Sequence, residues 1–131
     1  MPFEAKHRFA RISPRKARLV MDLIRGRDVD DAITLLRFSK QRVSGMIEKV
    51  VRSAVANATE QDVAQKRNAL YVASAWVDPG PTIKRFQPKD RGKAYSIKKR
   101  TSHLVVTVDE RKDGEHAPRK TIVGGRPGKA R

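Results

Sequence analysis

The sequence predicts an α+β fold in which three helices pack on a small antiparallel three-stranded sheet that carries a long protruding β-hairpin. Between residues 13 and 60, three segments have apolar residues every three or four positions, as amphipathic helices do. Two later segments, Ala69–Val77 and His103–Val108, are rich in the β-branched and aromatic residues that favour strands. With 131 residues and 38% hydrophobic content, the chain is expected to bury one core.

The N-terminal region predicts a strand followed by a helix. Short apolar and cationic residues alternate over Ala5–Ile12, which indicates a half-exposed strand. Ser13 then suits an N-cap, Pro14 the first helical position and Gly26 the position after the helix. The predicted inner face of this helix consists of Ala17, Val20, Met21 and Ile24. On another stripe, Arg15, Arg18 and Arg25 face outward together as a candidate RNA contact.

Two further helices follow. Asp28 and Asp31 favour the start of a short helix that turns Val29, Ala32, Ile33 and Leu36 inward. From about Ser39 to Glu60 an unbroken apolar series predicts a longer helix. Its members are Val43, Met46, Ile47, Val50, Val51, Ala54, Val55 and Ala58. Because the last turns of this stripe carry alanines, we expect the helix to approach its partner, a sheet, closely there.

The stretch Pro81–His103 connects the two predicted strands as a hairpin whose turn is Gln87–Gly92. If the numbers of paired residues sum to 180, the predicted cross-strand pairs are Trp76–Leu104, Val72–Val108, Phe86–Ala94 and Ile83–Ile97. A bulge at Pro79–Pro81 would shift this register. Since a two-stranded ribbon is marginally stable in water, its outer half, Thr82–Arg100, is expected to gain order from a partner or to stay disordered until it binds one.

The net charge of +16 is unevenly distributed. Residues 1–27 carry +6, residues 80–100 carry +7 and residues 111–131 carry +5, whereas residues 28–79 are neutral and residues 101–110 carry −2. Concentrated cations gain most from releasing the counterions of phosphates, so these segments indicate a polyanionic partner. The predicted RNA-binding residues are Lys6, Arg8, Arg11, Arg15, Lys16, Arg18, Arg25, Lys84, Arg85, Lys89, Arg91, Lys93, Lys98, Lys99, Arg100 and His103.

Other classes of function find little support. No carboxylate pair, nucleophile motif or phosphate-binding loop accompanies the three histidines, so we expect no enzyme, no metal and no cofactor. The chain has no cysteine, no apolar run of bilayer length and no signal-peptide pattern, which favours a cytoplasmic protein without a membrane partner. Aromatic content is only 5%, which counts against a stacking platform for single strands. Phe86 and Tyr95 are the exceptions, and they either stack on unpaired bases or pack on each other.

The segments "AKHRFARISPRKARLVMDLIRG", "EKVVRSAVANA" and "DPGPTIKRFQPKDRGKAYSIKKRTSHLVV" closely resemble the bacterial L22 family of large-subunit ribosomal proteins, over about Ala5–Val108. The resemblance implies a globule near the exit of the nascent-peptide tunnel and a hairpin that runs through large-subunit rRNA. The implied partners are several rRNA domains, neighbouring ribosomal proteins and the nascent polypeptide. We then expect residues 1–110 to form one domain, with an extended hairpin at about 79–103, and residues 111–131 to form a basic irregular tail.

The resemblance also implies roles for the hairpin. Ile83, Lys84 and Arg85 match a family segment whose changes affect macrolide susceptibility, and Gly92, Lys93 and Ala94 match residues that face the nascent chain. The implied tunnel-facing tip is Pro88, Lys89, Asp90, Arg91, Gly92, Lys93 and Ala94. Asp90 and Lys98 depart from the family pattern, and the role of the tail stays open. The rival hypotheses are a free-standing nucleic-acid-binding protein and an enzyme that acts on RNA.

Overall fold

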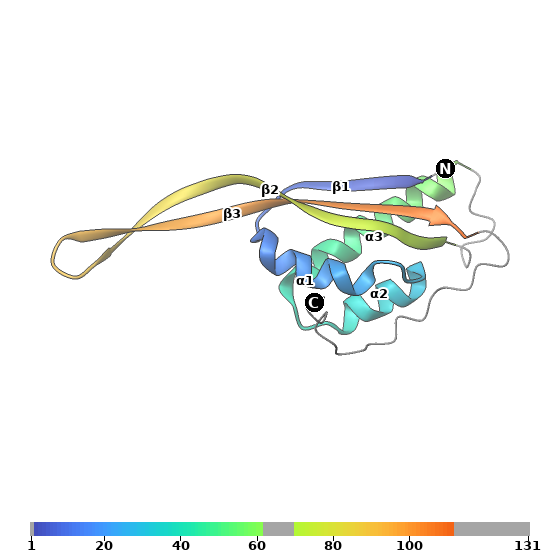
Figure 1. The fold of residues 1–131 in the computed structure, drawn as a ribbon, viewed down its shortest axis with the longest axis horizontal. Coiled ribbons are helices and arrows are strands. Elements are labelled where there is room, and N and C mark those ends of the chain that lie inside the picture. The colour runs from blue at the N-terminus through green and yellow to red at the C-terminus, as the bar shows by residue number, and fades with distance from the viewer. Residues whose placement is uncertain (1, 62–69, 112–131) are drawn as a thin grey trace, which may run out of the picture.

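The three predicted helices form and cover one face of a three-stranded antiparallel sheet in the computed structural model, which describes residues 2–61 and 70–111 (Figure 1). The elements follow in the order β1 (Phe3–Ala10), α1 (Pro14–Ile24), α2 (Val29–Phe38), α3 (Arg42–Glu60), β2 (Leu70–Lys89) and β3 (Lys93–Glu110). The predicted fold class is confirmed. In the part of the chain described, no helix is long and apolar enough to cross a membrane.

The helix boundaries follow the local sequence signals. Ser13 is the N-cap of α1, Pro14 begins it, and Gly26 beyond its end has φ +78°, which glycine adopts at little cost. Asp28 is the N-cap of α2. The third helix begins at Arg42, after the N-cap Gln41, rather than at Ser39, because the backbone N–H of Ser39 closes α2 by donating to Leu35.

The core lies between these helices and the sheet. Every residue predicted to face inward on the three helices is buried, except Met46, which is partly buried against the core. The strand order is β1-β3-β2, so β3 is central and turns Leu104, Val106 and Val108 toward the helices. Helix α3 packs on β1 and β3. Its alanines at 54 and 58 are fully buried, as the close approach requires.

Beyond the helices, β2 and β3 continue as a two-stranded extension that protrudes far from the globule (Figure 1). We call the paired segment Thr82–Arg100 the ribbon. Among the described residues, only Ile83 and Ile97 of the ribbon are half-buried, and the rest of the ribbon is exposed. Its cations and its two aromatic side chains are exposed.

The predicted register is correct only at the start of the pairing. Val72 pairs with Val108, but an irregularity between Val72 and Ser74 shifts the pairing by one residue, so Trp76 faces Val105 rather than Leu104. A second shift between Pro79 and Thr82, at the predicted bulge, adds another residue. The predicted pairs Phe86–Ala94 and Ile83–Ile97 are therefore wrong. Phe86 pairs with Ser96, and Ile83 pairs with Lys99.

The new register also separates the two aromatic residues of the ribbon. Tyr95 pairs with Gln87, the neighbour of Phe86, so the aromatic rings point to opposite faces. Mutual packing of Phe86 and Tyr95 is thus excluded in this conformation. The Lys89 ammonium lies 5.9 Å from the centroid of the Tyr95 ring instead, while Phe86 stays 75% exposed.

Tight packing fixes the bulge at the base of the ribbon. The Thr101 hydroxyl donates a hydrogen bond of 2.6 Å to the carbonyl of Pro81. A Cβ atom on Gly80 would lie 2.5 Å from Thr101 Oγ1 and 3.3 Å from the Thr101 carbonyl carbon. Only glycine therefore fits between the two strands where the ribbon leaves the sheet.

Candidate RNA-binding surface

A groove of about 800 Å³ lies where the ribbon meets the globule. Three parts of the chain form it: the turn from β1 into α1, the start of α3, and the inner part of the ribbon. Its lining residues are Arg11, Ile12, Ser13, Lys16, Gln41, Arg42, Val43, Ile83, Arg85, Lys98, Lys99 and Arg100. Seven of these are Lys or Arg and none is acidic. We call it the basic groove.

The basic groove combines residues that are far apart in sequence. Arg11 and Lys16 flank the N-cap of α1, and the ribbon adds Arg85 and Lys98–Arg100 from its two strands. Strand β1 ends at Ala10 and α1 begins at Pro14, so the short connection holds both N-terminal cations at the foot of the ribbon. Such a concave lining, whose charged residues are all cationic, concentrates positive potential where a phosphate backbone would enter.

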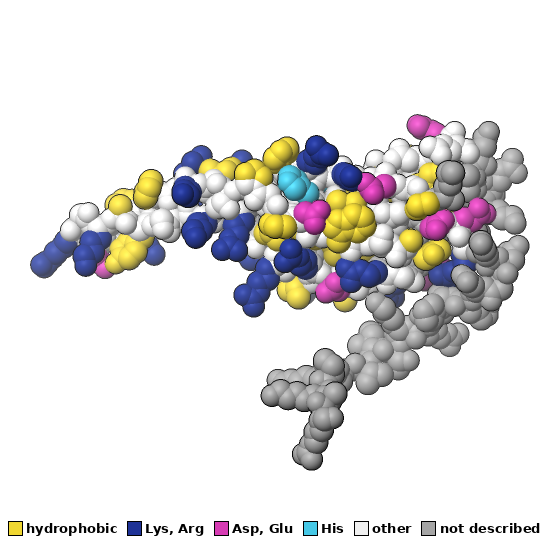
Figure 2. Space-filling view, turned by 45° about the horizontal axis from the view of Figure 1, so that its top comes forward, with side chains coloured by type: hydrophobic (Ala, Val, Ile, Leu, Met, Phe, Trp, Pro, Cys, Tyr) yellow, Lys and Arg dark blue, Asp and Glu magenta, His cyan; other side chains and the backbone are white. Residues whose placement is uncertain are grey.

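A second, smaller groove of about 280 Å³ lies at the ribbon base, lined by Pro14, Pro79, Gly80, Thr82, Lys84, Lys98, Arg100 and Thr101. The ribbon alternates its side chains between faces, so Lys84 and Arg85 enter different grooves. Cations thus line both sides of the ribbon. Figure 2 shows Lys and Arg in dark blue along the ribbon and around its base, while Asp and Glu in magenta lie mainly over the globule.

Like charges also face each other across the ribbon. Lys84 pairs directly with Lys98, and Lys89 pairs directly with Lys93. Directly opposed like charges destabilise a strand pair by mutual repulsion. The ribbon of the free protein therefore carries a repulsion that a polyanion between or beside these lysines would relieve.

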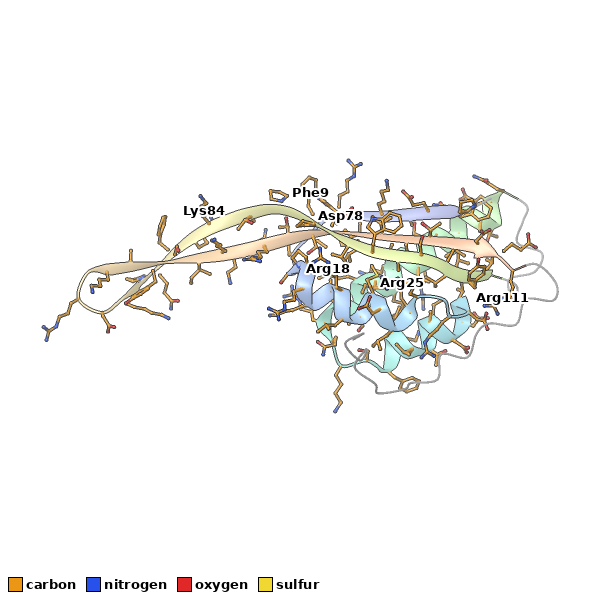
Figure 3. All side chains as sticks on the ribbon, in the orientation of Figure 1. Phe9, Arg18, Arg25, Asp78, Lys84 and Arg111 are labelled. Atoms are coloured by element: carbon orange, nitrogen blue, oxygen red, sulfur yellow. The ribbon has the colours of Figure 1, made fainter. Side chains whose placement is uncertain are left out.

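Two of the three arginines predicted to face outward from α1 contact the sheet. Arg18 Nη2 donates to the carbonyl oxygen of Val77 (3.1 Å), and Arg25 Nε donates to that of Ala75 (3.1 Å). Both carbonyls belong to β2, the edge strand, and Figure 3 shows both arginines beside it. Arg18 is nevertheless exposed, as predicted, and Arg25 is half-buried, because unpaired edge carbonyls attract donors from both side chains. RNA contacts by these two arginines stay predictions. Arg15 stays exposed.

Three other predicted RNA-binding residues lie on or near the sheet rather than in the grooves. The Lys6 ammonium forms an ion pair of 2.7 Å with Glu4 on the same strand. His103 accepts a hydrogen bond at Nδ1 from the backbone N–H of Phe9 (3.1 Å), and their rings meet edge to face. Arg8 is exposed on β1. RNA contacts by Lys6, Arg8 and His103 stay predictions.

The hairpin turn is shorter than predicted. Pairing continues to Lys89 and Lys93, so only Asp90, Arg91 and Gly92 form the loop. All three have positive φ values (+41°, +38° and +80°), and the N–H of Lys93 donates to the carbonyl of Asp90 (3.0 Å). The turn exposes the Arg91 side chain at the far end of the ribbon.

Sequence reasoning missed Arg42, which lines the basic groove at the first position of α3. It lies in the segment that is neutral overall, and averaging charge over that segment concealed it. Two other arginines of this segment form ion pairs outside the groove. Both Arg37 (3.1 Å) and Arg52 (2.6 Å) pair with Glu48, and the hydrogen bond from Arg37 holds the pKa of that carboxyl below its usual value.

The described residues, 2–61 and 70–111, contain no group of three or more His, Cys, Asp or Glu side chains placed to hold a metal ion. The predicted tail lies outside them apart from Arg111.

Comparison with known proteins decides the family. Residues 5–109 match the family described as ribosomal protein L22p/L17e. The chain belongs to this family. This confirms the resemblance inferred from the sequence. Members of this family are structural components of the ribosome. The prediction that the chain is not an enzyme is therefore also confirmed.

Curated relatives agree with the match. The large ribosomal subunit protein uL22 of Carboxydothermus hydrogenoformans is 50% identical over 114 residues, which cover 87% of this chain and all of the relative. Proteins of the same name from Thermoanaerobacter sp. and Thermoanaerobacter pseudethanolicus are each 50% identical over 111 residues, covering 85% of this chain and 99% of each relative.

Proposed function

We propose that the protein binds large-subunit rRNA through the basic groove and the ribbon, supports assembly of the subunit, and lines the nascent-peptide exit tunnel with its tip. Its family makes it a structural constituent of the large ribosomal subunit, which in bacteria is cytoplasmic. Its expected partners are rRNA, neighbouring ribosomal proteins and, at the tip, the nascent polypeptide.

The observation that carries the proposal is the basic groove at the foot of a ribbon with no protein core of its own. Seven cations face one concavity, and lysines oppose each other on the ribbon above it. Releasing counterions from RNA phosphates would supply the free energy that orders the ribbon, since two strands alone are marginal in water. In this proposal the folded globule binds RNA at its surface, and the ribbon inserts into the RNA and becomes ordered only there.

The tip is the part that we propose faces the tunnel. Its loop residues are exposed and lie at the greatest distance from the globule (Figure 1). Asp90 places a carboxylate among the cations of the tip, so the field there is weaker than at the ribbon base. We also propose that residues 1–110, including the hairpin, act as one domain and that the tail from residue 111 is separate from it.

Photocrosslinking from position 91 in living cells tests this proposal. With a photoreactive amino acid in place of Arg91, we expect crosslinks to large-subunit rRNA and to nascent chains. The same substitution at Lys49, an exposed residue on α3, is the matched control and should give no crosslink to nascent chains. Incorporation of both variants into large subunits without any nascent-chain crosslink from position 91 would contradict the placement of the tip.

A further inference from the structure

The face of the sheet opposite the helices carries an aromatic surface that RNA binding through the grooves does not use. The register places Trp76, Val105 and Lys6 in one row across this face, and Asp78 beside His103 in the next. Val105 is only 3% exposed although none of the described helices lies on this face, and the longer side chains of its two partners flank it. Trp76 is 39% exposed, and Phe9, at 60%, packs edge to face on His103.

Trp76 and Asp78 form a pair on this face. The indole Nε1 of Trp76 donates to Oδ2 of Asp78 (3.2 Å), which fixes the ring beside an exposed carboxylate. In Figure 3, Asp78 and Phe9 lie close to where the ribbon leaves the sheet. An aromatic face next to a carboxylate suits a guanidinium group, which stacks on the ring while its N–H groups donate to the carboxylate.

The chain itself shows this chemistry elsewhere. The Arg111 guanidinium lies 5.1 Å from the centroid of the Tyr71 ring and pairs with Asp28 at 2.8 Å. Within the fold, one arginine thus contacts both an aromatic ring and a carboxylate. Across residues 2–61 and 70–111, no cation takes the corresponding place at Trp76 and Asp78.

Charge favours a protein over RNA as the occupant. The Lys6 ammonium is paired with Glu4, and strand alternation places one further cation, the exposed Arg8, on this face. Asp78 and Asp109 form no ion pair with the described residues, so carboxylates outnumber the remaining cation. In a chain of net charge +16, these two carboxylates make this face less favourable for phosphate than the grooves and suited to a basic side chain of a polypeptide.

We propose that the open sheet face at Trp76 and Asp78 docks an arginine-containing segment of another ribosomal protein, with the guanidinium stacked on Trp76 and paired with Asp78. This rests on the proposed place in the large subunit but adds a protein partner on the side away from the helices. The contact needs no RNA at the site itself.

The only tryptophan of the chain lies at this site, so the intrinsic fluorescence of the full-length protein reports on it alone. Titration with acetyl-Gly-Arg-Gly-amide should give a saturable change, and acetyl-Gly-Lys-Gly-amide a weaker one. The substitution Asp78→Asn should weaken binding of the arginine peptide roughly two- to fivefold, the range for exposed charge and cation–π contacts. The matched control Asp109→Asn removes the same charge from the same face and should leave affinity unchanged.

Equal responses to both peptides, or an Asp78→Asn variant that binds as the wild type does, would overturn the proposal. So would a response to a short adenosine oligonucleotide larger than that to the arginine peptide, which would indicate base stacking on Trp76.

Crosslinking in assembled large subunits tests the same site in its own setting. A photoreactive residue at Ser74, beside Trp76 on this face, should crosslink to an arginine-containing peptide of another ribosomal protein. The yield should fall several-fold with Asp78→Asn but not with Asp109→Asn. Crosslinks to rRNA, to the chain's own residues 112–131, or to nothing would each refute the proposal. Failure of the unmodified protein to sediment with large subunits would instead refute the proposed function.

Discussion

Lys84 and Lys98 lie directly opposite each other on the two strands of the ribbon, where a stable hairpin would place a complementary pair. The register that creates this repulsion results from two irregularities in the pairing of β2 with β3. A register without them would have placed the isoleucines of the ribbon opposite each other. The opposed lysines therefore support the proposal that the ribbon binds an anion, since their repulsion makes the ribbon less stable alone.

Reversing one of these charges should separate ribbon stability from RNA binding. Lys84→Glu creates a cross-strand Glu–Lys pair, which should stabilise the free ribbon by about 0.2–1 kcal/mol and raise its amide protection. The same change should weaken binding to large-subunit rRNA, since it places a carboxylate among the phosphates. Lys49→Glu, the same substitution at an exposed site on α3, should affect neither property. Weaker protection in the Lys84→Glu ribbon would mean that the opposed lysines do not repel.

The salt dependence of rRNA binding measures how many cations meet phosphate. With six to ten contacts, affinity should fall roughly 10³- to 10⁵-fold between 50 and 200 mM salt, taking the rule for duplex DNA as a guide. Arg42→Ala should weaken binding and reduce the slope of log affinity against log salt by about one. Arg52→Ala, which removes an arginine already paired with Glu48, should leave the slope unchanged. If Arg42→Ala left the slope at its wild-type value, the basic groove would not hold phosphate.

Gly80 is expected to be irreplaceable at the ribbon base. Gly80→Ala puts a methyl group 2.5 Å from Thr101 Oγ1, so the strands must shift, at a cost of about 1–3 kcal/mol. Chemical shifts should change around Pro79–Thr82 while the helices stay intact, and rRNA affinity should fall. Adding Thr101→Ala should recover part of the loss, because it removes the clashing hydroxyl.

Gly45→Ala is the matched control for Gly80→Ala. Nothing lies within 4 Å of the added methyl group there, and alanine favours the helix over glycine. It should therefore be neutral or stabilising. Equal tolerance of alanine at both glycines would show that the bulge at the ribbon base is not constrained by Thr101.

The sequence was sufficient to predict the helices because each buried stripe repeats over several turns. Residues that favour helix ends, such as Ser13, Pro14 and Gly26, agree with the stripes. The register of the strands was harder. In the ribbon, side-chain alternation survives the summed shift of two residues, so the apolar pattern there cannot distinguish the true pairing from one without irregularities. Pro79–Pro81 marked one irregularity, but nothing in "YVASAWV" marked the other.

The sequence predicted which segments of the candidate site are cationic, but not which residues come together to form the groove. A cation count identifies the ribbon, whereas Arg42 joins the basic groove only because the start of α3 folds beside β1 and the ribbon. Conversely, Arg18 and Arg25 were expected to face outward, and their contacts depend on β2 being an edge strand with free carbonyls. The place of Arg42 and the contacts of Arg18 and Arg25 both depend on tertiary packing, which residue spacing along a helix does not predict.

Deleting Ile83–Arg85 should redirect the tip without unfolding the globule. Three residues lost from β2 leave three of β3 without partners, so side chains beyond the lesion must change faces or loop out. Under the proposed function, ribosomes with this deletion should assemble and translate but respond differently to macrolides and to tunnel-stalling peptides. Mass spectrometry should find the deletion variant in these ribosomes. If it does and both responses are unchanged, the tip is not part of the tunnel wall.

Amide hydrogen exchange, compared between the free protein and the protein bound to large-subunit rRNA, tests most directly the claim that RNA completes the ribbon. In the free protein, amides of Thr82–Arg100 should exchange far faster than those of Val50 and Val106 in the core. On RNA, ribbon protection should rise by orders of magnitude while core protection changes little. Ribbon amides protected as strongly as the core in RNA-free protein would contradict the account.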